Sequence, residues 1–140
     1  MILLDTNVIS ELIKPSPEPA VSAFLRRAVP ETVFTAAVCL AEIRYGLARL
    51  PVGRRRNDLT GRVSAFFAES FTNRTLAFDS TSAAIYGELR AARETAGKPI
   101  AVEDAMIAAT ARAYGAVVVT RNVADFMGCG VEIVSPWVED

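Results

Sequence analysis

The sequence predicts an α/β fold in which helices cover both faces of a parallel β-sheet. Short apolar runs alternate with segments of helical periodicity along the whole chain, as expected for repeated strand–helix units. The run 117–119 consists of three valines, and a strand that is apolar at every position is typically covered on both faces. The chain has 140 residues, of which 51% are hydrophobic. We therefore expect one domain, residues 1–140, with its own core.

Five short apolar runs are the predicted strands. They are rich in valine, isoleucine and leucine and are bounded by polar or turn-forming residues, as is typical of buried strands. The predicted strands cover residues 2–4, 33–38, 76–78, 117–120 and 132–134.

Turn and cap residues divide the remaining sequence into six predicted helices. The proline cluster 15–19 ends the first helix, because proline cannot continue a helix. Ser80 or Thr81 is expected to cap the fifth helix, and Gly97 and Gly115 end the fifth and sixth. The predicted helices cover residues 6–13, 20–28, 40–50, 59–71, 80–96 and 102–114.

The sequence contains no histidine. This excludes serine and cysteine triads that depend on histidine, histidine general bases and histidine metal sites. Chemistry must come from carboxylates, hydroxyls, arginines, thiols or a bound hard cation. The two cysteines, Cys39 and Cys129, lie in apolar surroundings, so we expect reduced, buried thiols rather than a disulfide.

The near-neutral net charge of −1 hides one basic segment. Residues 44–62 contain six arginines and one aspartate, a local charge of +5, while the rest of the chain has nine bases and fifteen acids. The arginine run 54–56 is expected to lie in a solvated loop, and contact with RNA or with an acidic partner is the alternative. No apolar run is long enough to span a bilayer and the first residues lack the features of a signal peptide, so we expect a cytoplasmic protein without membrane attachment.

Acidic residues follow several predicted strands. Asp5 comes directly after the first strand, Glu42 lies near the start of the helix after the second, and Asp104 lies near the start of the sixth helix. Asn122 and Asp125 follow the fourth strand. Each could merely cap a helix or turn, but polar sites of parallel sheets gather at the carboxyl ends of the strands.

Converging carboxylates predict a metal site. Without a cation they repel one another and raise each other's pKa. Oxygen ligands suit Mg²⁺ or Mn²⁺, and a metal held in this way can activate water for attack on phosphorus. The acids therefore predict phosphodiester hydrolysis.

Four ordered segments carry a family resemblance. They read DTNVISEL over 5–12, AEIRYG over 41–46, VEDAMIAAT over 102–110 and TRNVADF over 120–126, and VSPW follows at 134–137. Over its full length the chain resembles a PIN domain of the VapC type, FitB-like subgroup, the ribonuclease toxin of type II toxin–antitoxin pairs.

The resemblance implies a three-layer α/β/α sandwich with a parallel sheet of about five strands. It also implies a Mg²⁺- or Mn²⁺-dependent endoribonuclease, usually a homodimer, that is silenced by a cognate antitoxin which binds operator DNA. By the family pattern, Asp5 and Asp104 are the principal metal ligands and Glu42 is the third acid. The fourth acidic position falls at Asn122 or Asp125. Asn122 departs from the members that have aspartate there, and an amide holds a second ion less firmly.

Several polar and aromatic residues are candidate supports of the site. Thr6 and Thr120 either bind a phosphate or metal-bound water or satisfy backbone groups at strand ends. Asn7 is expected to support the first helical turn, and Arg44 either meets a phosphate or the acids, or forms a salt bridge with Glu11. The residues that offer a stacking surface for bases, with protein packing as the alternative, are Tyr45, Tyr86 and Trp137.

Two other functions compete with the nuclease. A haloacid-dehalogenase-like phosphatase also begins with an aspartate after a strand, but it needs a second aspartate where this chain has Asn7. The other alternative is a PIN binding module that has lost catalysis through Asn122 and acts only through its antitoxin complex.

Overall fold

The computed structural model describes residues 1–138, and a five-stranded sheet lies at its centre. The strand order is β3-β2-β1-β4-β5 and every pair is parallel, which confirms the predicted fold class. The strands are β1 Ile2–Leu4, β2 Val33–Ala36, β3 Thr75–Leu76, β4 Val117–Val119 and β5 Ile133–Val134.

The central strand β1 is buried because it pairs on both sides. Leu3 pairs with Phe34 of β2 and with Val118 of β4. Leu3, Leu4 and the β4 residues Val118 and Val119 have no exposed surface. This is the covered, continuously apolar strand that the valine run predicts.

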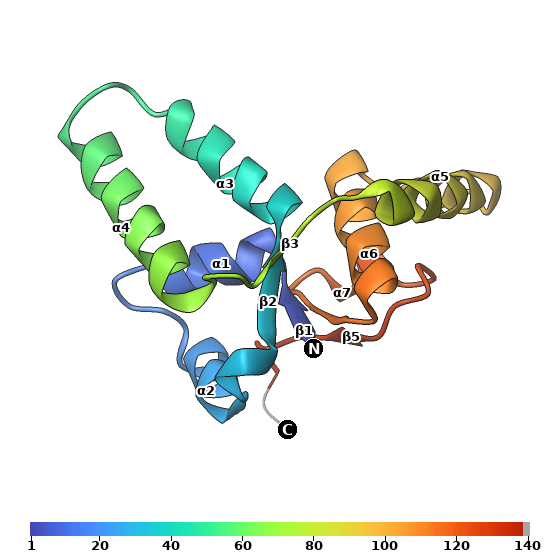
Figure 1. The fold of residues 1–140 in the computed structure, drawn as a ribbon, viewed down its shortest axis with the longest axis horizontal. Helices are drawn as coiled ribbons and strands as arrows, with labels where there is room; N and C mark the ends of the chain where they lie inside the picture. The colour runs from blue at the N-terminus through green and yellow to red at the C-terminus, as the bar shows by residue number, and fades with distance from the viewer. Residues whose placement is uncertain (139–140) are drawn as a thin grey trace.

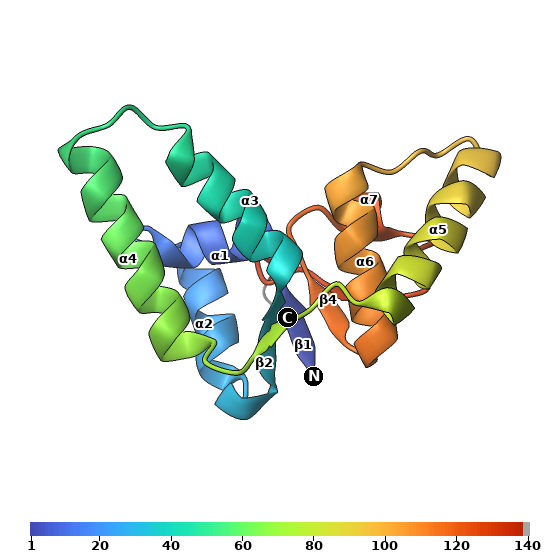
Figure 2. The same cartoon turned by 45° about the horizontal axis from the view of Figure 1, so that its top comes forward.

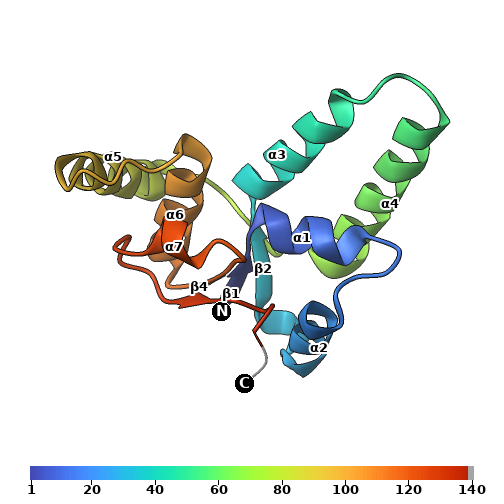
Figure 3. The same cartoon turned by 180° about the vertical axis from the view of Figure 1, so that it is seen from behind.

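Helices cover both faces of the sheet. Figures 1 and 3 show α1, α2 and α4 on one side and α5, α6 and α7 on the other. Figure 2 shows α3 rising from the end of β2 between these two groups. This confirms the three-layer arrangement. The helices are α1 Thr6–Ile13, α2 Pro19–Arg27, α3 Ala37–Ala48, α4 Arg54–Ser70, α5 Ser80–Thr95, α6 Val102–Tyr114 and α7 Val123–Phe126, with a 3₁₀ turn at Pro30–Thr32.

Helix α6 lies against the sheet through small side chains. Its buried residues include Ala105, Ala108 and Ala109 beside Ile107, and alanines let a helix approach its neighbours closely. Full burial of a side chain such as Ile107 contributes about 1.5–3 kcal/mol. Gly115 ends the helix in the left-handed conformation, with φ 68°, as predicted.

Some predicted boundaries are wrong. β2 ends at Ala36 and α3 begins at Ala37 rather than at 40. α4 begins at Arg54, five residues before the predicted start at 59, so the arginine run lies in a helical turn and not in a loop. Arginine is a good helix former, and the run therefore extends the helix. The predicted hydroxyl cap of α5 is also wrong, because the Asp79 carboxylate accepts the Ser82 N–H at 2.9 Å.

Two further expectations concern the cysteines and the membrane. Cys39 and Cys129 are both buried and free, as predicted. Among residues 1–138, every helix falls short of the length and apolar character that crossing a bilayer requires.

Candidate active site

Asp5 lies where β1 passes into α1. Its Oδ1 accepts the Val8 N–H at 3.1 Å and so caps α1. Its Oδ2 accepts the Thr120 hydroxyl at 2.5 Å. The side chain is buried, and burial raises its pKa while the Thr120 hydrogen bond partly opposes the rise. Asp5 therefore caps α1, but capping uses only one of its two carboxylate oxygens.

Thr120 joins the end of β4 to the end of β1. Its buried hydroxyl donates to Asp5 and accepts the backbone N–H of Asn122 at 3.0 Å. The sequence offered a phosphate, a metal-bound water or a strand-end backbone group as its partner. The Asn122 N–H confirms the backbone alternative. The sequence did not predict the second partner, the Asp5 carboxylate, which Thr120 positions.

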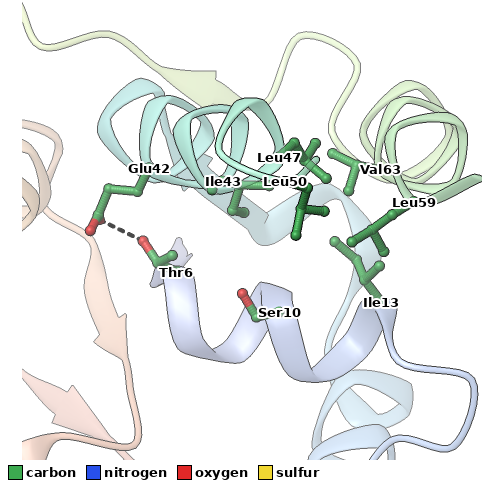
Figure 4. Close-up of a pocket in the computed structure, with 10 residues that line it drawn as sticks. Thr6, Ser10, Ile13, Glu42, Ile43, Leu47, Leu50, Leu59 and Val63 are labelled. Atoms are coloured by element: carbon green, nitrogen blue, oxygen red, sulfur yellow. Dashed lines mark hydrogen bonds between the residues drawn. The ribbon is translucent and has the colours of Figure 1, made fainter. Parts of the chain in front are cut away.

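Thr6 and Glu42 make the corresponding link between α1 and α3. The Thr6 hydroxyl donates to Glu42 Oε1 at 2.7 Å, as Figure 4 shows. Glu42 is half-buried and its second oxygen remains available. The hydrogen bond holds the Glu42 carboxylate at the start of α1. Its donor, Thr6, directly follows Asp5 in the sequence.

Asp104 lies in the first turn of α6, and capping does not explain it. The cap position is Ala101, which makes no side-chain cap bond. The Asp104 carboxyl is half-buried, and its pKa is raised to about 6 by burial first and then by the charges of Asp125, Glu42, Asp5 and Glu103. Asp5 at the end of β1 and acids from α3, α6 and α7 thus act on one carboxyl group at the carboxyl edge of the sheet.

Asp125 and Asn122 contribute differently to this environment. Among the neighbouring charges, that of Asp125 has the largest effect on the pKa of Asp104. Asn122 is exposed at the cap position of α7 and makes no side-chain cap bond. The Asp125 backbone is held by Arg93, whose Nη1 donates to its carbonyl oxygen at 3.0 Å. The charge at the fourth strand end therefore comes from Asp125.

The donor set fits a hard divalent cation that keeps part of its water shell. Within residues 1–138, no three carboxylate or thiol side chains converge closely enough to enclose an ion. Mg²⁺, however, is typically bound by one or two carboxylates together with water and substrate phosphate. Burial is the first cause of the raised pKa of Asp104, and the charges of the neighbouring acids add to it. A bound cation would relieve that repulsion.

The structure agrees with the role predicted for Asn7 but not with the salt bridge predicted for Arg44. The backbone N–H of Asn7 lowers the pKa of Asp5, in keeping with support of the first helical turn. The predicted salt bridge between Arg44 and Glu11 is wrong. Arg44 donates to Ser64 at 3.4 Å, while Glu11 pairs with Lys14 at 2.8 Å.

A groove of about 300 Å³ extends from the Thr6–Glu42 pair between α1, α3 and α4. Figure 4 shows apolar side chains along most of its length. They are Ile13, Ile43, Leu47, Leu50, Leu59 and Val63. The sequence alone does not predict this groove, because it forms only when three separate helices pack.

The fold and the acid cluster define an α/β/α protein with an acidic site at the carboxyl edge of a parallel sheet. The family model described as the PIN domain matches residues 2–125. The chain belongs to the PIN domain family, as the sequence resemblance indicates.

Similar proteins extend over nearly the whole chain. It is 42% identical over 137 residues to "VapC ribonuclease Y4jK" of Sinorhizobium fredii, covering 98% of each chain. It is also 42% identical over 137 residues to "Toxin FitB" of Neisseria gonorrhoeae, covering 98% of this chain and 99% of that protein. A solved structure described as FitAB bound to an IR36 DNA fragment is similar with a TM-score of 0.91 and 41% identity, and it covers 100% of this chain and 98% of that chain.

Proposed function

We propose that this chain is a Mg²⁺- or Mn²⁺-dependent endoribonuclease and the toxin of a toxin–antitoxin pair. The observation that carries the proposal is the pair of hydrogen bonds by which Thr120 and Thr6 fix the carboxylates of Asp5 and Glu42. The charges of Asp5, Glu42 and Asp125 also act on Asp104, whose pKa burial and these charges raise to about 6. Membership of the PIN family and the similarity to proteins named as a VapC ribonuclease and a FitB toxin support it.

Asp5 and Asp104 are the residues that would hold the metal directly. Glu42 would be the third ligand, through a metal-bound water, and Asn122 and Asp125 would complete the site. When bound, the ion lowers the pKa of a water molecule and stabilises negative charge on the phosphodiester. Thr120 fixes Asp5 and Thr6 fixes Glu42, so both carboxylates are oriented before substrate arrives. The free oxygen of Glu42 orients the attacking water, and Asn122 supplies a neutral oxygen.

The partners follow from the same proposal. RNA is the substrate, and a small DNA-binding antitoxin holds the nuclease inactive, since an uncontrolled ribonuclease would damage its own cell. The similar FitAB structure, solved on DNA, supports an assembly of this kind. We further propose that the chain, as a single domain, forms a homodimer in the cytoplasm, with a higher assembly when the antitoxin is bound.

Purified protein and cellular RNA test the activity. We expect cleavage with added Mg²⁺ or Mn²⁺, loss of cleavage with a chelator, and loss of at least a hundredfold in Asp5→Ala and Asp104→Asn, because each removes a proposed metal ligand. Arg27→Ala is the matched control, since Arg27 is exposed on α2. Metal-loaded protein that cleaves no RNA but still binds a partner protein would instead support the non-catalytic binding module.

A further inference from the structure

A second cavity lies between α1, Arg121 and Trp137 of the C-terminal segment. Its volume is about 230 Å³, below the size of a whole small-molecule site but suited to part of a longer chain. Two of its residues, Asn7 and Arg121, directly follow the site threonines Thr6 and Thr120. The lining residues are Asn7, Ser10, Glu11, Lys14, Arg121 and Trp137; we refer to this cavity as the Arg121 cleft.

Arg121 is oriented by an aromatic ring rather than by an acid. Its guanidinium carbon lies 5.0 Å from the centroid of the Trp137 ring. The Arg121 side chain is exposed. Among residues 1–138, the ion pairs are made by other cations, so Arg121 has no carboxylate partner there. A guanidinium that stacks on an indole keeps the N–H groups at its edge available, and this planar fork matches phosphate oxygens.

Lys14 is a second cation in the Arg121 cleft. Its ammonium group lies 2.8 Å from Glu11 Oε2, and the Glu11 side chain is only 10% exposed while that of Lys14 is 61% exposed. The buried carboxylate therefore holds the ammonium group at the mouth of the cleft. With Arg121 included, the charged lining residues carry a net charge of +1.

The other groove at the site has the opposite character. Its lining is mostly apolar, and Glu42 is the one charged residue among those that line it within the described chain. A polyanion gains nothing from such a lining. The acids themselves repel RNA, so cations beside them are needed to hold the backbone in place.

We propose that the Arg121 cleft binds the RNA phosphate next to the one that is cut. Arg121 contacts its oxygens through the guanidinium fork, Lys14 adds a second cation, and Trp137 is a positioning residue for Arg121. This inference rests on the proposed ribonuclease function and adds a substrate-binding subsite to it.

Binding of a short fluorescein-labelled single-stranded RNA, measured by anisotropy, tests the subsite. All variants carry Asp104→Asn so that cleavage does not obscure binding. We expect Arg121→Ala to weaken binding about tenfold, as for the loss of a charge-assisted contact, and to lower the salt dependence by about 0.7 in slope, as for one lost phosphate contact on a single strand. Arg27→Ala, which removes an exposed arginine outside the cleft, is expected to leave both unchanged.

A second pair of variants separates the positioning role of Trp137 from a general structural role. Trp137→Ala is expected to weaken binding severalfold while the salt slope stays as in the parent, because the Arg121 charge remains. Trp137→Phe is expected to restore most of the affinity, since a ring still supports the guanidinium. Thermal melts of each variant verify the fold, and Arg121→Gln replaces Arg121→Ala if the latter fails to fold.

The outcomes distinguish the subsite from the nuclease. Equal RNA affinity for Arg121→Ala and Arg27→Ala overturns the subsite, even if the parent protein cleaves RNA with metal. A selective loss of affinity in Arg121→Ala supports the subsite, even if no metal ion produces cleavage and the proposed catalytic function fails.

Discussion

The Thr120 hydroxyl donates a 2.5 Å hydrogen bond to Asp5 Oδ2 and links the ends of adjacent strands β4 and β1 across 115 positions of sequence. Both side chains are buried. The bond fixes the second oxygen of a carboxylate whose first oxygen already caps α1. Asp5 is therefore held from two elements, which is how a metal ligand is kept in place before the ion binds.

Replacing Thr120 tests this link. Thr120→Val keeps the shape of the side chain but removes its hydroxyl, so Asp5 loses a donor and the Asn122 N–H loses an acceptor. We expect a loss of about 1–3 kcal/mol in the free energy of unfolding, a higher pKa for Asp5, and at least tenfold lower cleavage. Thr120→Ser keeps the hydroxyl and should retain most of the stability and most of the cleavage activity. Urea denaturation and initial cleavage rates measure the effects, and equal rates for the two variants would contradict the positioning role.

We predict that the Thr6–Glu42 hydrogen bond affects cleavage more than it affects stability. The pair is only partly buried, so Thr6→Val should change the free energy of unfolding by no more than about 1 kcal/mol. Cleavage should fall at least tenfold, because the Glu42 carboxylate loses its orientation. Thr6→Ser is the control that keeps the donor. A variant that is strongly destabilised but fully active per folded molecule would show that the bond serves the fold alone.

The pKa of Asp104 predicts how stability depends on pH without metal. Since the folded-state pKa, about 6, exceeds the ordinary value of 3.8, the folded protein binds this proton more tightly than the unfolded chain. The contribution is complete below pH 3.8 and is lost as the pH rises through about 6. After allowance for solvent screening of the half-exposed carboxyl, we expect this contribution to the free energy of unfolding to be about 1 kcal/mol.

Asp104→Asn is the variant that isolates this contribution. It should remove the loss of stability between about pH 4 and pH 6 and should make the metal-free protein more stable than the parent at pH 7. Denaturation in the presence of a chelator, repeated across this pH range, measures the difference. Parallel pH profiles for the parent and the variant would contradict the raised pKa.

Asp125 rather than Asn122 should contribute to cation affinity. Asp125→Asn removes the neighbouring charge with the largest effect on Asp104 and should weaken Mn²⁺ binding severalfold, because the metal gains less from neutralising the cluster. Asn122→Ala removes only a neutral oxygen and should weaken Mn²⁺ binding less than Asp125→Asn does. Calorimetric titration with Mn²⁺ measures both, and an equal or larger loss in Asn122→Ala would place the fourth ligand at Asn122.

The sequence was sufficient to predict the sheet and the positions of the acids relative to its strands, because both depend on local patterns. Strand-like runs followed by carboxylates identify the ends of β1 and β4, and parallel pairing brings those ends to one edge whatever the details of packing. Asp104 was predictable for a related reason, since a strong helical pattern with a glycine stop fixes the position of α6.

The hydroxyl partners and the groove were not predictable because they depend on distances between separate elements. Thr6 and Thr120 each have several nearby acceptors along the chain, and only the packing of α1 against α3 and of β1 against β4 selects a carboxylate. The α5 cap was missed for a local reason. Asp79 and Ser80 are adjacent and are both good cap residues, so a shift of one residue decides between them.

We predict that acids from separate elements bind one divalent ion. Anomalous diffraction from crystals grown with Mn²⁺ tests it most directly, because the signal locates the ion without reference to activity. We expect a peak bordered by the carboxylates of Asp5 and Asp104, and no peak there in crystals of Asp104→Asn. A Mn²⁺-saturated crystal with no density between these two carboxylates, or with its ion bound elsewhere on the chain, would show that the acids do not form this metal site.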